Sequence, residues 1–300
     1  MMNEKKKLSK NAMIGYPAGI ITGVTYGLNP LFGKPLMQHG ASVESILLFR
    51  YLIAVVLLGA FLMCRRQSFK VSGRQLGVLL ALGVLFTLSS LGLFEAYNYI
   101  ASGLATTLVF LYPAIVAIIM VALGVVPSWQ VWLSLVATFA GVVVMTQGGS
   151  GGPADPVGVL LSVGSAAAYA LFIVIINRNK AIAQIPNTLL TFYALLTGAV
   201  IFFAKAMSAG TGLTHGIDGG FDWCCLVGLA VLPTIVSTAT LAVATRNIGA
   251  TKASVMGVFE PITAIVVGTV VFGEALTAPM VLGIVVSVAA ITFMVVTTKR

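Results

Sequence analysis

One apolar stretch of membrane-spanning length follows another from Met13 to Thr297, with only short polar interruptions between them. A helix needs about 20 apolar residues to cross the hydrocarbon core of a bilayer. Only 8% of the 300 residues are charged and 59% are hydrophobic, whereas about 25% of the residues of a typical soluble domain are charged. The sequence therefore predicts an all-α, polytopic membrane protein with little chain left for a soluble domain.

Glycine, proline and charge clusters divide this apolar sequence into ten predicted transmembrane helices. The predicted helices cover residues 13–37, 44–64, 75–98, 103–125, 130–146, 157–176, 187–206, 223–245, 253–272 and 278–297. Residues 1–12 and 298–300 form cytoplasmic tails, and residues 148–156 form an external linker between two five-helix repeats, 13–147 and 157–297.

The basic residues are concentrated in alternate loops. Of the 17 Lys and Arg residues, all but Lys34, Arg50 and Lys205 fall in the tails or in loops on one predicted side. Lys and Arg resist translocation, so such loops stay in the cytoplasm. Both chain ends are therefore expected in the cytoplasm. The net charge of +9 then reflects membrane topology, and no binding of nucleic acid is expected.

The sequence lacks the residues that several classes of function require. Neither the G-x-x-x-x-G-K-[ST] phosphate loop nor the H-E-x-x-H zinc motif occurs in the sequence. Both histidines, His39 and His215, fall in predicted loops, and no Asp lies within a predicted span. The three cysteines fit neither a disulfide framework nor a metal site. We therefore expect no enzyme, no cofactor and no metal.

The first and sixth predicted helices carry similar faces of small residues. When Gly15 is aligned with Gly158, small residues recur at four-residue intervals in both helices, and Tyr26 falls on Tyr169. Residues four apart share one helix face, and small faces let helices pack closely in lipid. The aligned small residues are Gly15, Gly19, Gly23 and Gly27 in the first helix and Gly158, Ser162, Ala166 and Ala170 in the sixth.

A similar alignment places Ile100 and Pro113 on Ile248 and Pro261, so the likeness extends along both halves. Each half has an odd number of helices, and the second half must therefore cross the membrane in the opposite sense. Such inverted repeats occur in many transporters, which expose one midplane site to each side in turn. The sequence therefore favours a transporter.

Ionisable side chains within the predicted spans are rare. A charged group in the hydrocarbon is costly and usually faces a bundle interior or an aqueous cavity. Arg50 in the second span and Glu95 in the third lie at similar depth, so the two could pair. One interpretation is a structural ion pair or a snorkelling Arg50. The other is a site at the outer mouth for a substrate carboxylate or a proton.

Glu260 lies near the middle of the ninth predicted span and directly precedes Pro261. Proline has no N–H, so it interrupts the helical hydrogen bonding one turn earlier. The equivalent position in the first half is Tyr112 before Pro113. Two broken helices at corresponding positions favour a binding region near the axis that relates the halves. A kinked packing helix, with Glu260 protonated or hydrogen-bonded, is the alternative.

Three tyrosines, Tyr26, Tyr112 and Tyr169, fall near the middle of their spans, whereas interfacial tyrosines lie at helix ends. A buried phenol needs a hydrogen-bond partner. Together with Asn29 and Asn98, these tyrosines could line a cavity with aromatic walls and few polar contacts, which is typical of a small-molecule site. For each tyrosine the alternative is core packing.

The chain resembles the ten-helix EamA-type branch of the drug/metabolite transporter superfamily over almost its whole length. The residues that carry the resemblance are the segment from Tyr26 to Pro35, Phe49-Arg50-Tyr51, the segments 96–101 and 105–108, the segment 244–250 running into Ala253-Ser254, Glu260-Pro261 and Phe272-Gly273-Glu274. The family's repeated Glu-Pro pair is intact only in the second half, because the first half has Tyr112-Pro113. Tyr26 stands where relatives commonly have tryptophan.

This resemblance implies a basket-like bundle around a central cavity that moves amino acids or related metabolites, usually outward. The chain is most similar to the bacterial aromatic amino acid exporters, so we expect a secondary transporter in the bacterial inner membrane. Its expected partners are the lipid bilayer and a small-molecule substrate, and we expect a monomer or a weak homo-oligomer.

The expected substrate-binding residues are Tyr26, Asn29, Arg50, Glu95, Asn98, Tyr112, Tyr169 and Glu260. One alternative function is a proton-coupled antiporter of drugs or cationic compounds, in which Glu260 would bind substrate and proton in turn. A passive channel or a scaffold is another alternative, which the inverted repeat disfavours.

Overall fold

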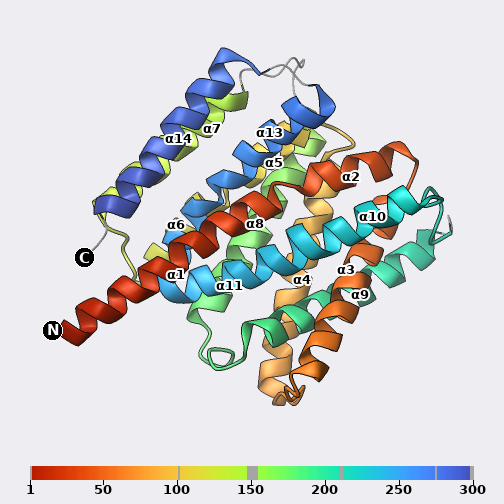
Figure 1. Cartoon of the computed structure of the whole chain (residues 1–300), viewed down its shortest axis with the longest axis horizontal. Helices are drawn as coiled ribbons and strands as arrows, with labels where there is room; N and C mark the ends of the chain where they lie inside the picture. Colours follow the sequence, from red (N-terminus) through yellow and green to blue (C-terminus); the bar gives the residue numbers. More distant parts are fainter. Residues whose placement is uncertain (1, 101, 147–154, 210–211, 274–275, 298–300) are drawn as a thin grey trace.

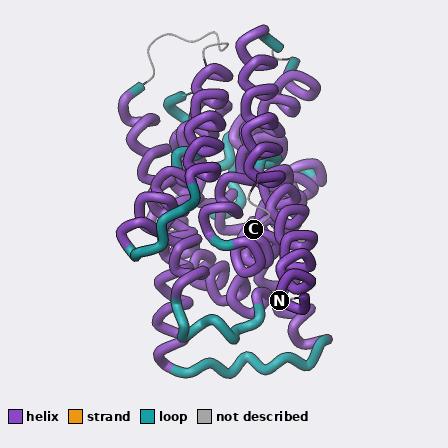
Figure 2. Tube along the Cα trace, turned by 90° about the vertical axis from the view of Figure 1, so that its left-hand side faces the viewer, coloured by secondary structure: helices purple, strands orange, loops and turns teal. Residues whose placement is uncertain are grey.

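The structure, a computed structural model, describes residues 2–100, 102–146, 155–209, 212–273 and 276–297. All regular structure in these residues is helical, and the helices are joined by mostly short loops (Figure 1, Figure 2). The predicted tail at 298–300 and residues 148–154 of the predicted linker lie outside the described residues. The expectation of an all-α protein is confirmed.

The first half of the chain forms seven helices. These are α1 (Met2–Tyr26), α2 (Asn29–Gln38), α3 (Val43–Cys64), α4 (Gly73–Ala96), α5 (Ser102–Val109), α6 (Tyr112–Ala122) and α7 (Trp129–Thr146). The second half contains α8 (Pro156–Arg178), α9 (Asn187–Ala209), α10 (Gly220–Leu229), the π-helix η1 (Ala230–Val236), α11 (Ser237–Ile248), α12 (Ala250–Val255), the 3₁₀ turn η2 (Met256–Val258), α13 (Phe259–Phe272) and α14 (Ala278–Thr297).

Each of the ten predicted spans is occupied by one helix or by consecutive helical pieces. Within the described residues, six helical runs are long and apolar enough to cross a membrane: Val43–Cys64, Gly73–Ala96, Pro156–Arg178, Asn187–Ser208, Gly220–Ile248 and Ala250–Phe272. Shorter apolar helices such as α6 accompany them. The chain is therefore a polytopic helical membrane protein.

The packing of the helices follows the internal repeat. Helix α1 of the first half packs along α11 of the second, and the repeat-related contact is that of α8 of the second half along α4 of the first. Helix α3 packs on α9, and α7 on α14. These two pairs each join a helix to its own repeat equivalent. Exchanging the halves therefore reproduces the same contacts, as a two-fold axis between the repeats requires.

The small residues of the repeat lie at equivalent close contacts. A Cβ atom on Gly15 would lie 2.5 Å from Ile248 Cγ2, and a Cβ atom on Gly158 would lie 2.8 Å from Ile100 Cγ2. Real Cβ atoms do not approach that closely, because the packing would overlap. Ile100 and Ile248 are themselves aligned in the sequence, so both halves use the same glycine-on-isoleucine contact.

Four of the ten spans are interrupted near their middle. Helix α1 ends at Tyr26 and α2 starts at Asn29 with Pro30 in its first turn, and α6 starts at Tyr112 with Pro113 next. Proline suits the first turn of a helix, where its missing N–H has no intrahelical partner to lose. The turn η2 interrupts the ninth span before Glu260-Pro261, and η1 interrupts the eighth around Pro233.

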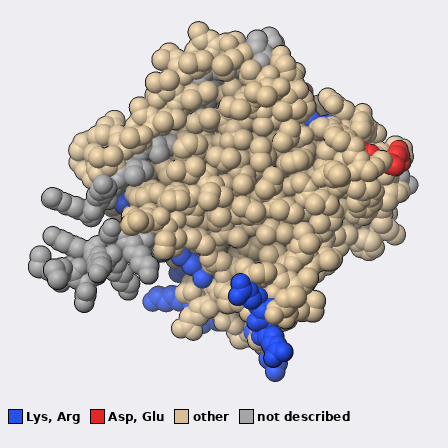
Figure 3. Space-filling view, in the orientation of Figure 1, with Lys and Arg blue, Asp and Glu red and all other residues tan. Residues whose placement is uncertain are grey.

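Charged residues gather at opposite ends of the bundle. Most of the visible Lys and Arg atoms lie along the lower edge of Figure 3, where Figure 1 shows the α3–α4 loop. The visible Asp and Glu atoms lie at the right of Figure 3. We call the first the basic end; the α3–α4 connection, flanked by Arg65 and Arg74, and the α8–α9 connection, flanked by Arg178 and Lys180, lie there (Figure 1). We call the second the acidic end; Lys205 contacts Glu44 and Glu95 there, and His39 contacts Asp222. Helix α1 begins and α14 ends on the same side of the molecule (Figure 1).

Candidate functional site

Arg50 lies in the middle of the protein on α3 and is fully buried. Its Nε donates to Thr234 Oγ1, its Nη1 to Asn29 Oδ1 at 3.0 Å and its Nη2 to the Pro233 carbonyl at 3.3 Å. Across the described residues, no carboxylate lies within ion-pair distance of it. A guanidinium has five N–H donors, so these contacts leave two of them for another acceptor.

The π-helix η1 prepares this arginine site. Pro233 has no N–H, so the Leu229 carbonyl one turn earlier loses its ordinary donor. The Thr234 hydroxyl replaces that donor and lies 2.7 Å from the Leu229 oxygen. π-Helical insertions of this kind are frequent at functional sites. The widened turn offers Arg50 two acceptors, the Thr234 hydroxyl and the Pro233 carbonyl, which sequence analysis did not identify.

The predicted pairing of Arg50 with Glu95 is wrong. Glu95 Oε1 lies 3.7 Å from Lys205 Nζ of α9, and Glu95 Oε2 accepts a hydrogen bond from Asn98 Nδ2 at 3.2 Å. Glu95 is about one quarter exposed, with 26% of its side chain accessible. Asn98 is exposed at the same acidic end and does not line the centre of the bundle. Similar depth in the membrane placed the two charges on a level, but their side chains face different neighbours.

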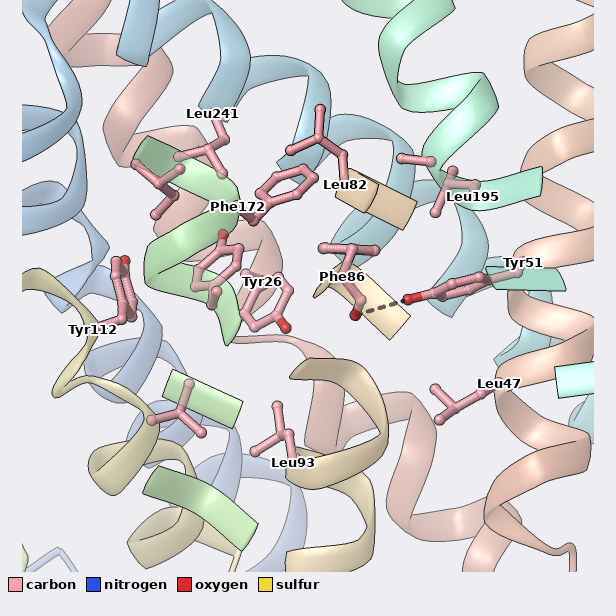
Figure 4. Packing of buried hydrophobic residues seen from close by; sticks show 14 of the residues in the cluster. Tyr26, Leu47, Tyr51, Leu82, Phe86, Leu93, Tyr112, Phe172, Leu195 and Leu241 are labelled. Atoms are coloured by element: carbon pink, nitrogen blue, oxygen red, sulfur yellow. Dashed lines mark hydrogen bonds between the residues drawn. The ribbon is translucent and has the colours of Figure 1, made fainter. Parts of the chain in front are cut away.

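The three central tyrosines do meet. Tyr26 and Tyr169 stack with ring centroids 5.6 Å apart and an interplanar angle of 13°, and Tyr112 contacts Tyr169 edge-on at 4.8 Å. All three are at most 2% exposed, and Figure 4 shows Tyr26 and Tyr112 among the buried apolar side chains. The hydroxyls of Tyr26 and Tyr169 have no hydrogen-bond partner in the described part of the chain.

Glu260 is fully buried next to these rings. The Tyr112 hydroxyl donates to its Oε1 at 3.1 Å, and its Oε2 has no partner among the described residues. Gly257 makes room for this contact, because a Cβ atom there would overlap the Tyr112 hydroxyl. Glu260 therefore keeps one unused acceptor in the protein interior, where an unpaired polar atom is costly.

Equivalent residues of the two repeats touch each other at this point. Tyr26 stacks on Tyr169, its counterpart in the second half, and Tyr112 binds Glu260, its counterpart before the second proline. Residues related by a two-fold axis can meet only near that axis. The site is therefore at the centre of the duplicated fold, where the sequence-based interpretation places a binding region.

The break between α1 and α2 contacts both Arg50 and Glu260. Asn29 accepts from Arg50 and donates through Nδ2 to the Tyr26 carbonyl at 2.8 Å. Gly27 packs directly against the backbone of Glu260, where a Cβ atom would meet the Glu260 carbonyl. We call the whole group the central polar cluster; its members are Tyr26, Asn29, Arg50, Tyr112, Tyr169, Thr234 and Glu260.

The cluster can bind a ligand of mixed charge. It holds one cation and one carboxyl group that are not paired with each other, with aromatic rings beside them. Its unused groups are two N–H donors of Arg50, the Tyr26 and Tyr169 hydroxyls and one Glu260 oxygen. The described residues contain no group of three or more His, Cys, Asp or Glu side chains that could hold a metal ion.

Comparison with known proteins bears on both halves of the chain. The profile of the EamA-like transporter family matches residues 13–147 and again residues 156–296. The chain belongs to the EamA-like transporter family. This membership confirms the predicted superfamily and makes the protein a multi-pass membrane transporter of small molecules.

A solved structure described only as "Crystal structure of protein" is similar to this EamA-like transporter in fold. It superposes with a TM-score of 0.75 at 16% sequence identity, over 97% of this chain and 99% of that chain. At this identity the likeness concerns the fold alone. No curated protein matches the sequence.

Proposed function

We propose that this EamA-like transporter exports zwitterionic amino acids with aromatic or hydrophobic side chains by alternating access. One observation carries the proposal: the centre of the bundle holds a buried guanidinium, Arg50, and a buried carboxyl group, Glu260, and neither has an ionic partner among the described residues. An α-amino acid supplies both missing partners in one small molecule.

The chemistry of the cluster fits the two ends of such a substrate. A guanidinium binds carboxylates through two parallel hydrogen bonds, so Arg50 takes the substrate carboxylate. Glu260, held by Tyr112, takes the ammonium group. The stacked rings of Tyr26 and Tyr169 lie in the same cluster, and they offer an apolar face to an aromatic or hydrophobic side chain.

The four broken spans support alternating access around this site. The α1–α2 break contacts both Arg50 and Glu260. The breaks in the fourth and ninth spans lie directly before Tyr112 and Glu260, which are joined by a hydrogen bond. Helix breaks absorb backbone rotation more easily than continuous helices do. We place the basic end in the cytoplasm of a bacterium by the positive-inside rule, so that export runs from the basic end to the acidic end.

Uptake and counterflow in liposomes test this proposal. Purified protein in vesicles loaded with unlabelled phenylalanine should accumulate labelled phenylalanine faster than protein-free vesicles, and the flux should saturate. Binding should require both charged groups, so phenylacetate and phenethylamine should each compete more weakly than phenylalanine. A flux equal to that of protein-free vesicles for all twenty amino acids would overturn the proposal, and a flux without saturation or counterflow would indicate a channel.

A second candidate is a proton-coupled antiporter of drugs or cationic compounds, favoured by the unpaired Oε2 of Glu260. In this case Glu260→Gln abolishes transport of organic cations, and phenylalanine does not compete with them. The buried cation of Arg50 disfavours a cationic substrate in the same cluster. Phenethylamine transport without phenylalanine transport would select this candidate.

A further inference from the structure

A cavity with polar lining lies away from the central polar cluster, at the basic end. Its volume is about 390 Å³, and it lies between the α6–α7 connection, the last turn of α8 and the start of α12. The polar residues that line it are Ser128, Asn177, Arg178, Thr251 and Lys252. This volume is large enough for a small amino acid or an organic acid.

The charged residues that line the cavity in the described part of the chain are both basic. Arg178 is exposed at the rim and Lys252 is half-buried. The apolar remainder includes Met120, Val131 and Ile248. A cavity with two cations, hydroxyl groups and an apolar wall suits a carboxylate that carries a hydrophobic side chain.

The cavity and the central polar cluster lie on the same two broken spans. Lys252 precedes Glu260 by eight residues, and Met120 follows Tyr112 by eight residues. Eight helical residues span about 12 Å, so the cavity is about two helical turns from the Tyr112–Glu260 pair toward the basic end. A molecule in the cavity is therefore on the line from the basic end to the centre.

The acidic end is closed by contacts between the two halves. Lys205 Nζ of α9 lies 2.9 Å from Glu44 Oε1 of α3 and 3.7 Å from Glu95 Oε1 of α4. His39 Nδ1, after α2, lies 2.7 Å from Asp222 Oδ1 of α10. Hydrogen bonds also join the halves at the basic end, where Gln75 Nε2 of α4 donates to the Ala181 carbonyl at 3.1 Å and the Tyr193 hydroxyl of α9 donates to the Phe69 carbonyl at 2.7 Å. The cavity nevertheless lies at this end, lined by other elements of both halves, so it can admit a ligand from the basic end.

We propose that this cavity is a vestibule site for the substrate, which binds the carboxylate through Arg178 and Lys252 before it passes to the central polar cluster. The assignment rests on the proposed function, since it makes the ligand an amino acid. The ligand chemistry itself, an anion at the basic end, is shared with the phosphate of an anionic lipid. The two sources need separate arms in one experiment.

Tryptophan fluorescence of the full-length protein in nanodiscs reads out the vestibule without transport. Trp129 follows Ser128 and Trp132 follows Val131, both of which line the cavity, and Trp223→Phe removes the remaining tryptophan. Titration of this protein with phenylacetate in phosphatidylcholine discs should give a saturable change in fluorescence. Phenethylamine, which has no carboxylate, should give none.

The cavity variant and its control decide the site. On the Trp223→Phe background, the pair Arg178→Gln and Lys252→Gln should weaken phenylacetate binding at least tenfold. The pair Lys70→Gln and Arg74→Gln removes two exposed bases from the same end, outside the cavity lining, and should leave the binding unchanged. Equal affinity in the cavity variant and the background protein would overturn the vestibule assignment.

The lipid arm separates the two sources of the anion. If phenylacetate binds in phosphatidylcholine discs but not in phosphatidylglycerol discs, a lipid phosphate occupies the cavity and the substrate assignment is overturned. Equal binding in both supports a vestibule for substrate. Because phenylacetate binding needs no transport, the absence of phenylalanine flux would overturn the proposed function while this titration still decides whether the cavity binds carboxylates.

Discussion

The two buried ionisable groups of the central polar cluster are held in different ways. Arg50 donates to three acceptors on two neighbouring segments, whereas Glu260 has the single donor Tyr112 and one oxygen without a partner among the described residues. Hydrogen bonds offset the desolvation of a buried charge. Arg50 is therefore fixed in place before a ligand arrives, and Glu260 keeps an acceptor open. We infer from this difference that Arg50 anchors the ligand and that Glu260 exchanges its binding partner during transport.

Replacing Arg50 with Gln has the largest expected effect, because it removes the anchoring cation. Hydrogen bonds to charged groups contribute about 1.5–3 kcal/mol each, so phenylalanine affinity should fall about 100-fold, or about 2.7 kcal/mol. Isothermal titration of detergent-solubilised protein measures the loss. The control Arg50→Lys keeps the charge and should retain part of the affinity. Wild-type affinity in Arg50→Gln would contradict a role in carboxylate binding.

Replacing Glu260 with Gln should weaken phenylalanine binding by about tenfold, because the ammonium group loses one charged partner. Phenylacetate lacks the ammonium group and should bind to this variant as it does to the wild type. The Arg50→Gln variant provides the reverse comparison, since it should spare phenethylamine. An equal loss for phenylalanine and phenylacetate in Glu260→Gln would show that Glu260 supports the structure instead of the ligand.

The hydroxyl of Tyr112 should matter for stability more than that of Tyr26. Tyr112→Phe leaves the buried Glu260 without its donor, and an unsatisfied buried polar group costs about 1–3 kcal/mol. Tyr26→Phe removes a hydroxyl that has no partner in the described residues, so it should leave stability unchanged or raise it. The midpoints of thermal unfolding in detergent compare the two variants. Equal midpoints would mean that the Tyr112–Glu260 contact contributes nothing to the fold.

The smallest effect is expected outside the cluster. Asn98 is exposed and donates only to Glu95 at the acidic end, and an exposed polar contact contributes little to stability. Phenylalanine affinity of Asn98→Ala should remain within about twofold of the wild type in the same titration. A loss comparable to that of Glu260→Gln would extend the binding site to the acidic end.

Features that repeat along the chain could be predicted without the structure. The ten apolar runs gave the spans, because a bilayer demands about 20 apolar residues per crossing whatever the neighbours are. The alignment of Tyr26 with Tyr169 and of Pro113 with Pro261 placed the duplicated centre, and its residues do meet there. Family membership and a helical membrane fold followed from the same patterns and are confirmed.

The partners of individual side chains could not be predicted in this way. Sequence position gives the depth of a residue in the membrane, and on depth alone Arg50 and Glu95 looked like a pair. The direction of a side chain around its helix depends on how the helices pack. Pro233 and Thr234 lie inside an ordinary apolar run, so only the packed structure identified them as partners of Arg50.

The sequence by itself determined that the chain crosses a membrane as two related halves, because hydrophobicity and repetition are properties of the chain. The tertiary structure alone decided that no carboxylate of the described residues lies beside Arg50 and that Tyr112 donates to Glu260. Such pairings depend on contacts between helices far apart in sequence. Packing in three dimensions fixes these contacts, and no local pattern encodes them.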